Sequence, residues 1–171
     1  VVATGAPHVK YWVHHNMITI NGQKMAKSKN NFITLEEMFT GGSPLLEKAY
    51  SPMTVRFYML QAHYSSPLDF SNDSLKAAEQ GLNRLMKGVE LVSRLTPSDA
   101  STADVQSLVE NGYAAIGDDM NCPILLGHLF EAVRIANSVK DGKERLNQAD
   151  LAILQDFLRT FTAEVLGLVP E

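Results

Sequence analysis

The sequence predicts a mainly α protein in which a short β-hairpin and a polar loop precede an antiparallel helical bundle. A strand–turn–strand pattern occupies residues 17–23, and apolar residues recur at helical spacing over most of residues 71–168. Short polar stretches separate the helical segments, which favours antiparallel packing of neighbouring helices. With 171 residues, 45% of them apolar, the chain can bury roughly 70% of its extended surface in a core.

The hairpin is predicted from alternating residues and from its turn. Ile18 and Ile20 flank Thr19, and Asn21-Gly22 is typical of a tight two-residue turn. Residues 24–31 are mostly polar and are expected to form a mobile loop. This N-terminal part looks like the edge of a larger domain.

Six helices are expected after the loop, most of them preceded by a residue that caps a helix N-terminus. The caps are Thr34, with Glu37 completing a capping box, Ser51, Ser71, Asn121, and Asn147, with Asp150 in the box position. The helices are expected over residues 35–40, 52–64, 72–95, 103–116, 123–140 and from Asn147 through 165, with residues 96–102 as a linker.

The longer helices carry apolar residues at the spacing of one helical face, so these residues are expected to form the core. They are Val55, Tyr58 and Met59 in the second helix; Leu75, Ala78, Leu82, Leu85, Met86, Val89 and Val92 in the third; Leu125, Leu126, Leu129, Phe130 and Val133 in the fifth; and Leu151, Leu154, Phe157, Leu158, Phe161 and Val165 in the last.

The net charge of −4 is unevenly distributed along the chain. Residues 1–35 carry four lysines and no acid, a charge of +4, so the remaining residues carry −8. A site for a polyanion is therefore expected near the N-terminus. The single cysteine, Cys122, excludes an internal disulfide and fits the reducing cytoplasm. No signal peptide is apparent, and no apolar run has the roughly 18 residues of a membrane span.

The lysines of the polar loop are the residues best suited to chemistry. Lys24 and Lys27 lie three positions apart in a segment that can close on one polyanion, and Lys29 stands beside them. Lysine is a compact positive charge that suits phosphate oxygens, and Ser28 can donate a further hydrogen bond. A solvated basic loop with no ligand explains the same spacing. The glycine-rich GxxxxGK(S/T) phosphate loop is absent from the sequence.

The segment Lys24-Met25-Ala26-Lys27-Ser28 resembles the KMSKS signature loop of class I aminoacyl-tRNA synthetases. Its surroundings narrow the resemblance to the cysteinyl-tRNA synthetases. Three segments are similar to theirs and follow the same order: residues 11–32, 51–75 and 118–123. Ala26 departs from the signature, which has serine at that position. Because both lysines are retained, we expect little effect of this departure.

The resemblance implies three parts in the chain. Residues 1–40 would be the end of a Rossmann-like catalytic domain with its KMSKS-type loop, residues 41–70 a connecting region that contacts the tRNA stem, and residues 71–171 a helical bundle of the kind that contacts the anticodon stem. Enzymes of this family activate cysteine with ATP to cysteinyl-adenylate and transfer the cysteine to tRNA(Cys). The chain is thus expected to be part of a cysteine–tRNA ligase.

The same resemblance assigns roles to the loop residues. Lys24 and Lys27 would be catalytic, binding the ATP phosphates and stabilising the charge that builds as the cysteine carboxylate attacks the α-phosphorus. Met25, Ala26 and Ser28 would complete the ATP-binding loop. Lys27 is the residue expected to matter most.

The family also implies cofactors and partners. The parent enzyme is expected to use ATP, Mg²⁺ and Zn²⁺, with the zinc ligands outside this chain, and to act on cysteine and tRNA(Cys) as a cytoplasmic monomer without a membrane partner. The HIGH-type motif and the zinc-binding residues are not found in the sequence. We therefore expect the chain alone to be an incomplete and inactive part of the enzyme.

Two alternatives remain open at this stage. One is the related cysteine ligase of mycothiol synthesis, which shares the adenylation chemistry but takes an amino-sugar acceptor. The other is a noncatalytic tRNA-binding helical module in which the lysine loop is inert.

Other residues could suggest chemistry but favour structural roles. Cys122 precedes a helix and could be a reactive thiol, although a half-buried turn residue is the stronger interpretation. His14 and His15 are adjacent, so on a strand they would point to opposite faces and could not share a metal. Asp118-Asp119 could hold magnesium, but the absence of a third nearby carboxylate favours a turn or cap. No metal site is expected in this chain.

Overall fold

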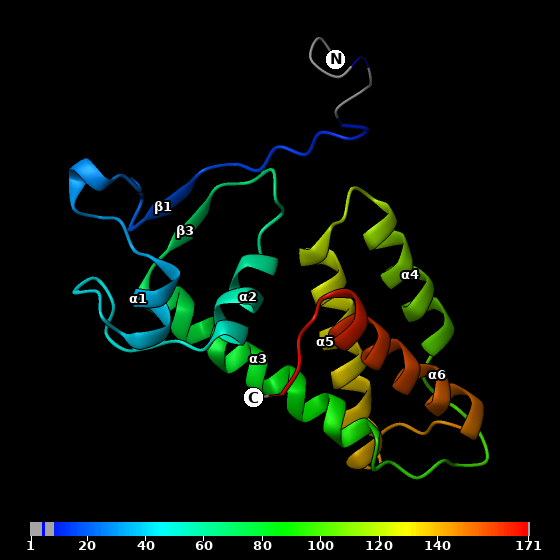
Figure 1. Ribbon diagram of the computed structural model, residues 1–171. Helices are drawn as coiled ribbons and strands as arrows, with labels where there is room; N and C mark the ends of the chain where they lie inside the picture. Colours follow the sequence, from blue (N-terminus) through cyan, green and yellow to red (C-terminus); the bar gives the residue numbers. More distant parts are fainter. Residues whose placement is uncertain (1–4, 6–8, 171) are drawn as a thin grey trace.

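The computed structural model, shown in Figure 1, describes residue 5 and residues 9–170, and it confirms a mainly α fold. A small sheet and a short helix come first, and the longer helices follow. The elements are β1 (Ile18–Ile20), β2 (Gln23–Lys24), the 3-10 turn η1 (Lys27–Lys29), α1 (Leu35–Thr40), α2 (Pro52–Leu60), β3 (Leu68–Phe70), α3 (Asn72–Val92), α4 (Val105–Gly117), α5 (Cys122–Lys140), α6 (Gln148–Arg159) and the π-helical turn η2 (Thr160–Val165).

The expected hairpin is confirmed. Strands β1 and β2 pair antiparallel, and the two turn residues both have positive φ, 49° at Asn21 and 74° at Gly22. Positive φ at both central positions is the geometry of a type I′ turn, whose twist matches that of the flanking strands. Asparagine and glycine adopt it at little cost, so the local sequence alone determines this element.

The sheet has a third strand that the sequence analysis missed. β3 lies on the other side of β1 and runs parallel to it, with Ile18 opposite Leu68 and Ile20 opposite Phe70. The carboxylate of Asp69 joins the two segments, accepting from the Thr19 hydroxyl at 2.6 Å and from the Gly22 backbone N–H at 2.7 Å. A three-residue strand that forms only against a distant partner has too little periodicity to be recognised beforehand.

Helix α1 follows its prediction, and α2 is shorter than expected. Thr34 and Glu37 form the complete capping box, and Gly41 ends α1 with φ of 73°. Helix α2 begins at the Ser51 cap and ends at Leu60 rather than residue 64. Beyond that end, the carbonyl of Tyr64 accepts a hydrogen bond from the backbone N–H of Asn16, beside the sheet.

The prediction is wrong for one residue of the expected buried face of α2. Val55 and Tyr58 are buried, but Met59 is 47% exposed. The face that α2 buries includes Thr54 and Phe57, so its centre lies away from Met59.

Helix α3 connects the two halves of the molecule. It crosses the view in Figure 1 from α2 at one end to α5 and α6 at the other, and it packs against all three. Its Ser71 cap is confirmed, with Ser74 completing a capping box, and the helix ends at Val92 rather than residue 95. Most of its expected stripe is fully buried, while Met86 and Val89 are half-buried against the core.

A glycine sets the distance between α3 and α5. A β-carbon placed on Gly88 would lie 2.3 Å from Cγ2 of Val133, which is closer than any real contact. The absence of a side chain at Gly88 therefore allows the two helices to approach. Gly112 of α4 plays the same part against Phe157 of α6, where the added atom would lie 2.5 Å from the ring.

The other bundle helices start within two residues of their predictions. Asp104 caps α4, so this helix begins at Val105 rather than residue 103, and Asn121 caps α5 at Cys122. The linker over residues 96–102 is tied down at two points: Ser98 donates from its backbone to Leu146, at 2.7 Å, and Thr102 to Arg145, at 2.9 Å.

The end of the last helix departs from its prediction. Asn147 caps α6 as expected, but after Arg159 the chain widens into the π-helical turn. The backbone of Leu166 donates to Phe161, five residues earlier, at 2.9 Å. The extra residue in that turn rotates the following side chains. Val165, expected inside, is therefore 47% exposed, and Leu166 and Leu168 are buried instead.

The end of the chain is also tied to α2. Arg56 donates from Nε to the carbonyl of Leu166 at 2.6 Å, although the two residues are 110 positions apart. Gly167, with φ of 61°, lies against the same guanidinium, where a β-carbon would be 2.9 Å from Nη2. These contacts join the C-terminal segment to α2, which precedes the bundle in the sequence.

The contact at Gly88 leads to a test by two matched substitutions. Gly88→Ala should lower the free energy of unfolding by about 1–3 kcal/mol, because α3 and α5 must separate to admit the methyl group. Gly127→Ala, on α5 with nothing within 4 Å of the added atom, should raise it by about 0.5–1 kcal/mol. Urea unfolding of the chain measures both, and equal effects of the two changes would contradict the close packing.

Candidate functional site

The loop that carries the lysines is anchored at both ends by one asparagine. The side chain of Asn31 accepts from the backbone N–H of Ala26 at 2.9 Å and donates to the carbonyl of Lys24 at 3.0 Å. The side chain of Met25 packs against the core, and its backbone N–H donates to Ile18 at 3.4 Å. The base of the loop is thus fixed by neutral groups.

Between these anchors the chain forms the 3-10 turn η1. The backbone of Lys29 donates to Ala26 at 3.0 Å, and that of Asn30 donates to Lys27 at 3.2 Å. Asn30 has a left-handed conformation, with φ of 52°, which asparagine tolerates better than most residues. The expected loop therefore contains an ordered turn, and its mobility stays a prediction.

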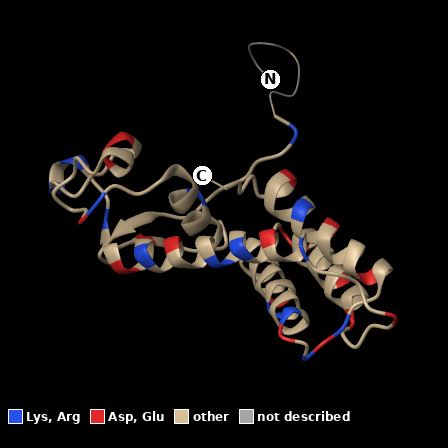
Figure 2. Ribbon diagram, turned by 90° about the horizontal axis from the view of Figure 1, so that it is seen from below, with Lys and Arg blue, Asp and Glu red and all other residues tan. Residues whose placement is uncertain are grey.

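The three lysines of the loop keep their charges free. Lys24, Lys27 and Lys29 are exposed, and within the part of the chain that the structure describes none of them forms an ion pair. Lys27 Nζ lies 5.4 Å from the centre of the Phe32 ring, a cation–π contact. The Ser28 side chain is also exposed. In Figure 2 the blue colour of this loop stands at one end of the molecule, away from the helical bundle.

Comparison with known proteins shows what this loop and its surroundings are similar to. Residues 1–80 match the family described as the tRNA synthetases class I (C) catalytic domain, and residues 113–170 match the DALR domain. Over all 171 residues, the chain is 53% identical to the cysteine–tRNA ligase of Parabacteroides distasonis, 48% to that of Bacteroides fragilis and 47% to that of Porphyromonas gingivalis.

The chain thus contains part of a class I tRNA synthetase catalytic domain and a DALR domain, and along its whole length it is similar to cysteine–tRNA ligases. It spans 35% of the length of each of these three relatives. Lys24, Met25, Ala26, Lys27 and Ser28 all lie inside the part that matches the class I catalytic domain. Their roles toward ATP stay predictions.

A cluster of polar contacts that sequence reasoning missed joins the region after α2 to the turn between α4 and α5. The Tyr64 hydroxyl donates to the Asp119 carboxylate at 2.7 Å, and His63 Nε2 lies 3.0 Å from the Asp119 carbonyl. The hydrogen bond to Asp119 raises the pKa of the Tyr64 hydroxyl, because this carboxylate accepts from its protonated form. Asp119 is thus a contact between two parts of the fold, a role that its sequence neighbourhood did not indicate.

The same turn has an unusual backbone. Asp119 and the following Met120 both have φ of 54°, in the left-handed region. Aspartate tolerates this conformation, whereas for methionine it costs about 1–2 kcal/mol. The hydrogen bonds that His63 and Tyr64 make to Asp119 stabilise the turn and so offset part of that cost.

Cys122 and His15, which were also considered for chemistry, have surroundings that favour structural roles. Cys122 is half-buried, as expected, and burial raises the pKa of its thiol, which disfavours the reactive thiolate. It borders an apolar hollow of about 480 Å³ between α2, β3 and the start of α5. His15 Nδ1 lies 2.8 Å from the carbonyl of the next residue, Asn16.

Residue 5 and residues 9–170 contain no group of three or more histidine, cysteine, aspartate or glutamate side chains that could hold a metal ion. None of the described helices is both long and apolar enough to cross a membrane.

The anchoring role of Asn31 can be tested by amide exchange. Asn31→Ala removes the acceptor of the Ala26 N–H, so this amide should exchange with solvent roughly 2–10-fold faster, the factor that one net hydrogen bond provides. Ser28→Ala removes an exposed hydroxyl from the same turn and should leave that rate unchanged. Hydrogen–deuterium exchange followed by NMR measures both variants, and equal rates would rule out Asn31 as the anchor.

Proposed function

We propose that the chain is the part of a cysteine–tRNA ligase that supplies the ATP-phosphate loop and the helical bundle. The whole enzyme would activate cysteine with ATP and transfer it to tRNA(Cys). The observation that carries the proposal is the loop itself. Lys24 and Lys27 are exposed, have no ion-pair partner among the described residues, and extend from a base that Asn31 holds.

The proposed reaction requires the loop to supply positive charge at a defined position. An oxygen of the cysteine carboxylate attacks the α-phosphorus of ATP, the bond from that phosphorus to the bridging oxygen breaks, and pyrophosphate leaves. Negative charge builds on the phosphate oxygens during this displacement. Lys24 and Lys27 would stabilise it electrostatically, without a covalent intermediate on the enzyme.

The arrangement of the loop suits this task. Several of its neutral backbone groups are already paired, so binding a ligand does not require those contacts to be exchanged. The charged ends remain in solvent. The Lys27 ammonium contacts the Phe32 ring, and an exposed cation–π contact contributes about 0.5–1 kcal/mol, which a phosphate can replace. A loop of this kind can deliver its charges when the transition state forms.

We assign no ligands of Mg²⁺ or Zn²⁺, the metals expected for the whole enzyme, among the described residues of this chain. Mg²⁺, when bound, neutralises phosphate charge, and Zn²⁺ is expected to be held by residues outside this chain. The described residues do not fit either ion, because they contain no cluster of metal-ligating side chains. No step of the proposed reaction is therefore assigned to a metal ligand of this chain.

The helical bundle would serve the second substrate. Residues 113–170 match the DALR domain, and the relatives named above are cysteine–tRNA ligases, so we assign tRNA(Cys) as the acceptor. A cytoplasmic, monomeric parent remains our expectation, as does the division of the chain at residues 40 and 70.

The role of the loop predicts a large effect of one substitution. In the whole natural enzyme, Lys27→Ala should lower the rate of cysteine-dependent ATP–pyrophosphate exchange by roughly 10²–10³, because a charge that acts in the transition state is lost. Cysteine affinity should be nearly unchanged. Lys29→Ala removes a lysine of the same turn that the signature does not include, and it should change the rate much less. A rate for Lys27→Ala within about twofold of the unmodified enzyme would contradict the phosphate role.

The amino acid is tested by the same exchange reaction with a panel of amino acids. Exchange with cysteine alone is expected. Exchange with cysteine but transfer to an amino sugar rather than tRNA would favour the related ligase of mycothiol synthesis. Absence of exchange with every amino acid would favour a noncatalytic tRNA-binding module.

A further inference from the structure

The carboxylate of Asp69 holds both parts of the hairpin that leads into the lysine loop. Its atom Oδ1 accepts from the Thr19 hydroxyl at 2.6 Å and from the Gly22 backbone N–H at 2.7 Å. Thr19 belongs to β1, and Gly22 belongs to the turn between β1 and β2. One oxygen atom is therefore bound to a strand and to the turn that follows it.

A short parallel ladder also attaches the hairpin to β3. The two strands pair over three residues, from Ile18 opposite Leu68 to Ile20 opposite Phe70, and they lie side by side in Figure 1. The backbone N–H of Asn21 donates to the carbonyl of Phe70 at 3.1 Å. Because a two-stranded hairpin is only marginally stable by itself, the position of β1 and β2 depends on their contacts with β3.

Strand β3 is in turn fixed to the helices that precede and follow it. The Tyr58 hydroxyl of α2 donates to the backbone carbonyl of Asp69. The centre of the Tyr58 ring lies 5.0 Å from that of Phe70, which is buried. Directly after Phe70, Ser71 caps α3. The side chain of Asp69 thus connects the hairpin to a strand that α2 and α3 hold in place.

The lysine loop begins where this hairpin ends. Lys24 is the last residue of β2, and η1 begins at Lys27. Asn31 closes the base of the loop through its bonds to Lys24 and Ala26. A shift of the hairpin therefore moves the base of the loop and both lysines with it. A displacement of about 1 Å at a reacting centre can lower a rate roughly 100-fold.

The two hydrogen bonds need an acceptor at position 69 rather than a negative charge. Thr19 stands opposite Lys24 on one side and Asp69 on the other, so the three residues form a row on one face of the sheet. Strands about 4.8 Å apart place the backbones of Lys24 and Asp69 about 10 Å from each other. Through water, the attraction of two unit charges at about 10 Å changes a rate by about twofold. An amide oxygen accepts the same two hydrogen bonds without the charge.

We propose that Asp69 is a positioning residue for the adenylation step: through Thr19 and Gly22 it holds the hairpin so that Lys24 and Lys27 reach the phosphates in the transition state. The inference rests on the proposed function, which assigns these lysines to ATP. Asp69 itself would touch neither ATP nor cysteine. Its loss should lower the rate of the step more than the affinity for ATP, because the charges would be misplaced in the transition state.

Substitutions in the whole natural enzyme separate the acceptor from the charge. Asp69→Ala removes the acceptor and should lower kcat of cysteine-dependent ATP–pyrophosphate exchange roughly 10–100-fold, with KM for ATP changed less than about threefold. Asp69→Asn keeps an acceptor oxygen and should stay within about twofold of the unmodified enzyme. Thr19→Val removes one of the two donors and should lower kcat roughly 3–10-fold, the factor that one net hydrogen bond provides.

A combination with Lys27→Ala tests whether Asp69 acts through the loop. Asp69→Ala should lower the rate much less in the Lys27→Ala enzyme than in the unmodified one, since a charge that it positions is already gone. Gly88→Ala is the control for lost stability, because Gly88 lies against Val133 in the bundle. Well below its unfolding temperature, that variant should exchange at a nearly normal rate.

Three results would overturn the inference: a normal kcat for Asp69→Ala, an equal loss in Asp69→Asn, or full additivity with Lys27→Ala. If Asp69→Ala does not fold, equal rates for Thr19→Val and Asp69→Asn would overturn it instead. A slow Lys27→Ala enzyme beside a normal Asp69→Ala enzyme would remove only the positioning role of Asp69. A normal rate for Lys27→Ala, or no exchange by the unmodified enzyme, would remove the proposed function and that role with it.

Discussion

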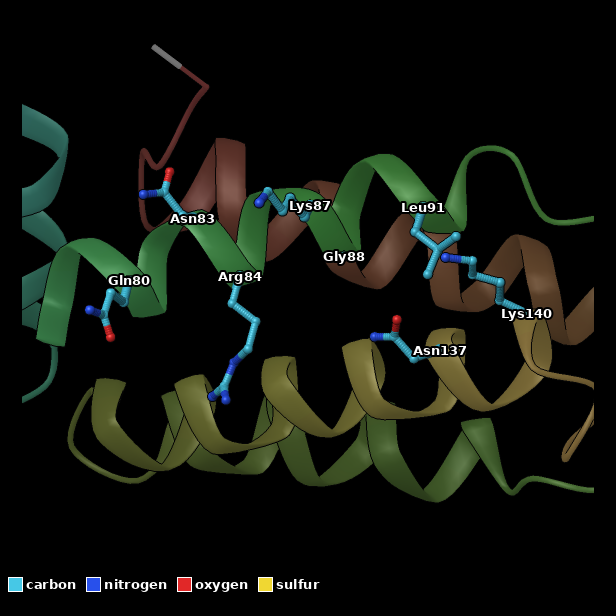
Figure 3. A pocket seen from close by; sticks show the side chains of 8 residues that line it. All are labelled: Gln80, Asn83, Arg84, Lys87, Gly88, Leu91, Asn137 and Lys140. Carbon is cyan, nitrogen blue, oxygen red and sulfur yellow. The ribbon is translucent and has the colours of Figure 1, made fainter.

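The contact between Gly88 of α3 and Val133 of α5 is the constraint on which the helical half of the structure depends. Because no side chain stands at Gly88, the two helices approach closely along one stretch. Gly88 itself lies in the lining of a groove between these two helices, which Figure 3 shows. The other lining residues are Gln80, Asn83, Arg84, Lys87, Leu91, Asn137 and Lys140. The same helix α3 also packs against α2, so it connects the bundle to the part of the chain that carries the sheet and its loop.

The loop and the groove hold cations in place in two different ways. A site for a polyanion, such as the one proposed for the loop, needs positive charges that are positioned but not neutralised. In the loop, the hydrogen bonds of Asn31 position the backbone and leave the lysines free. In the groove, the ring of Phe130 positions Arg84 without offering it a negative charge. Elsewhere in the described bundle, most cations form ion pairs at the surface, which contribute little stability but cancel the local field.

The elements that could be predicted from the sequence are those whose signals are local. Asn21-Gly22 determined the hairpin turn, and Thr34, Ser51, Ser71, Asn121 and Asn147 located the helix starts, because each of these side chains acts within three residues of itself. Strand β3 and the contact of Tyr64 with Asp119 could not be predicted, since each depends on a partner about 50 residues away. The outward position of Val165 had a different cause, because a π-helical turn changes the period on which the stripe was counted.

The charged residues also differ in whether the local sequence could reveal them. Lys24 and Lys27 could be recognised because a signature keeps them within five consecutive residues. Lys87 and Lys140, 53 residues apart in the sequence, line one groove, and unlike Arg94 and Lys143 they form no ion pair with another described residue. Net charge could not reveal this, since the bundle is acidic as a whole. For a polyanion the relevant quantity is the local potential, which depends on which cations are paired and therefore on the fold.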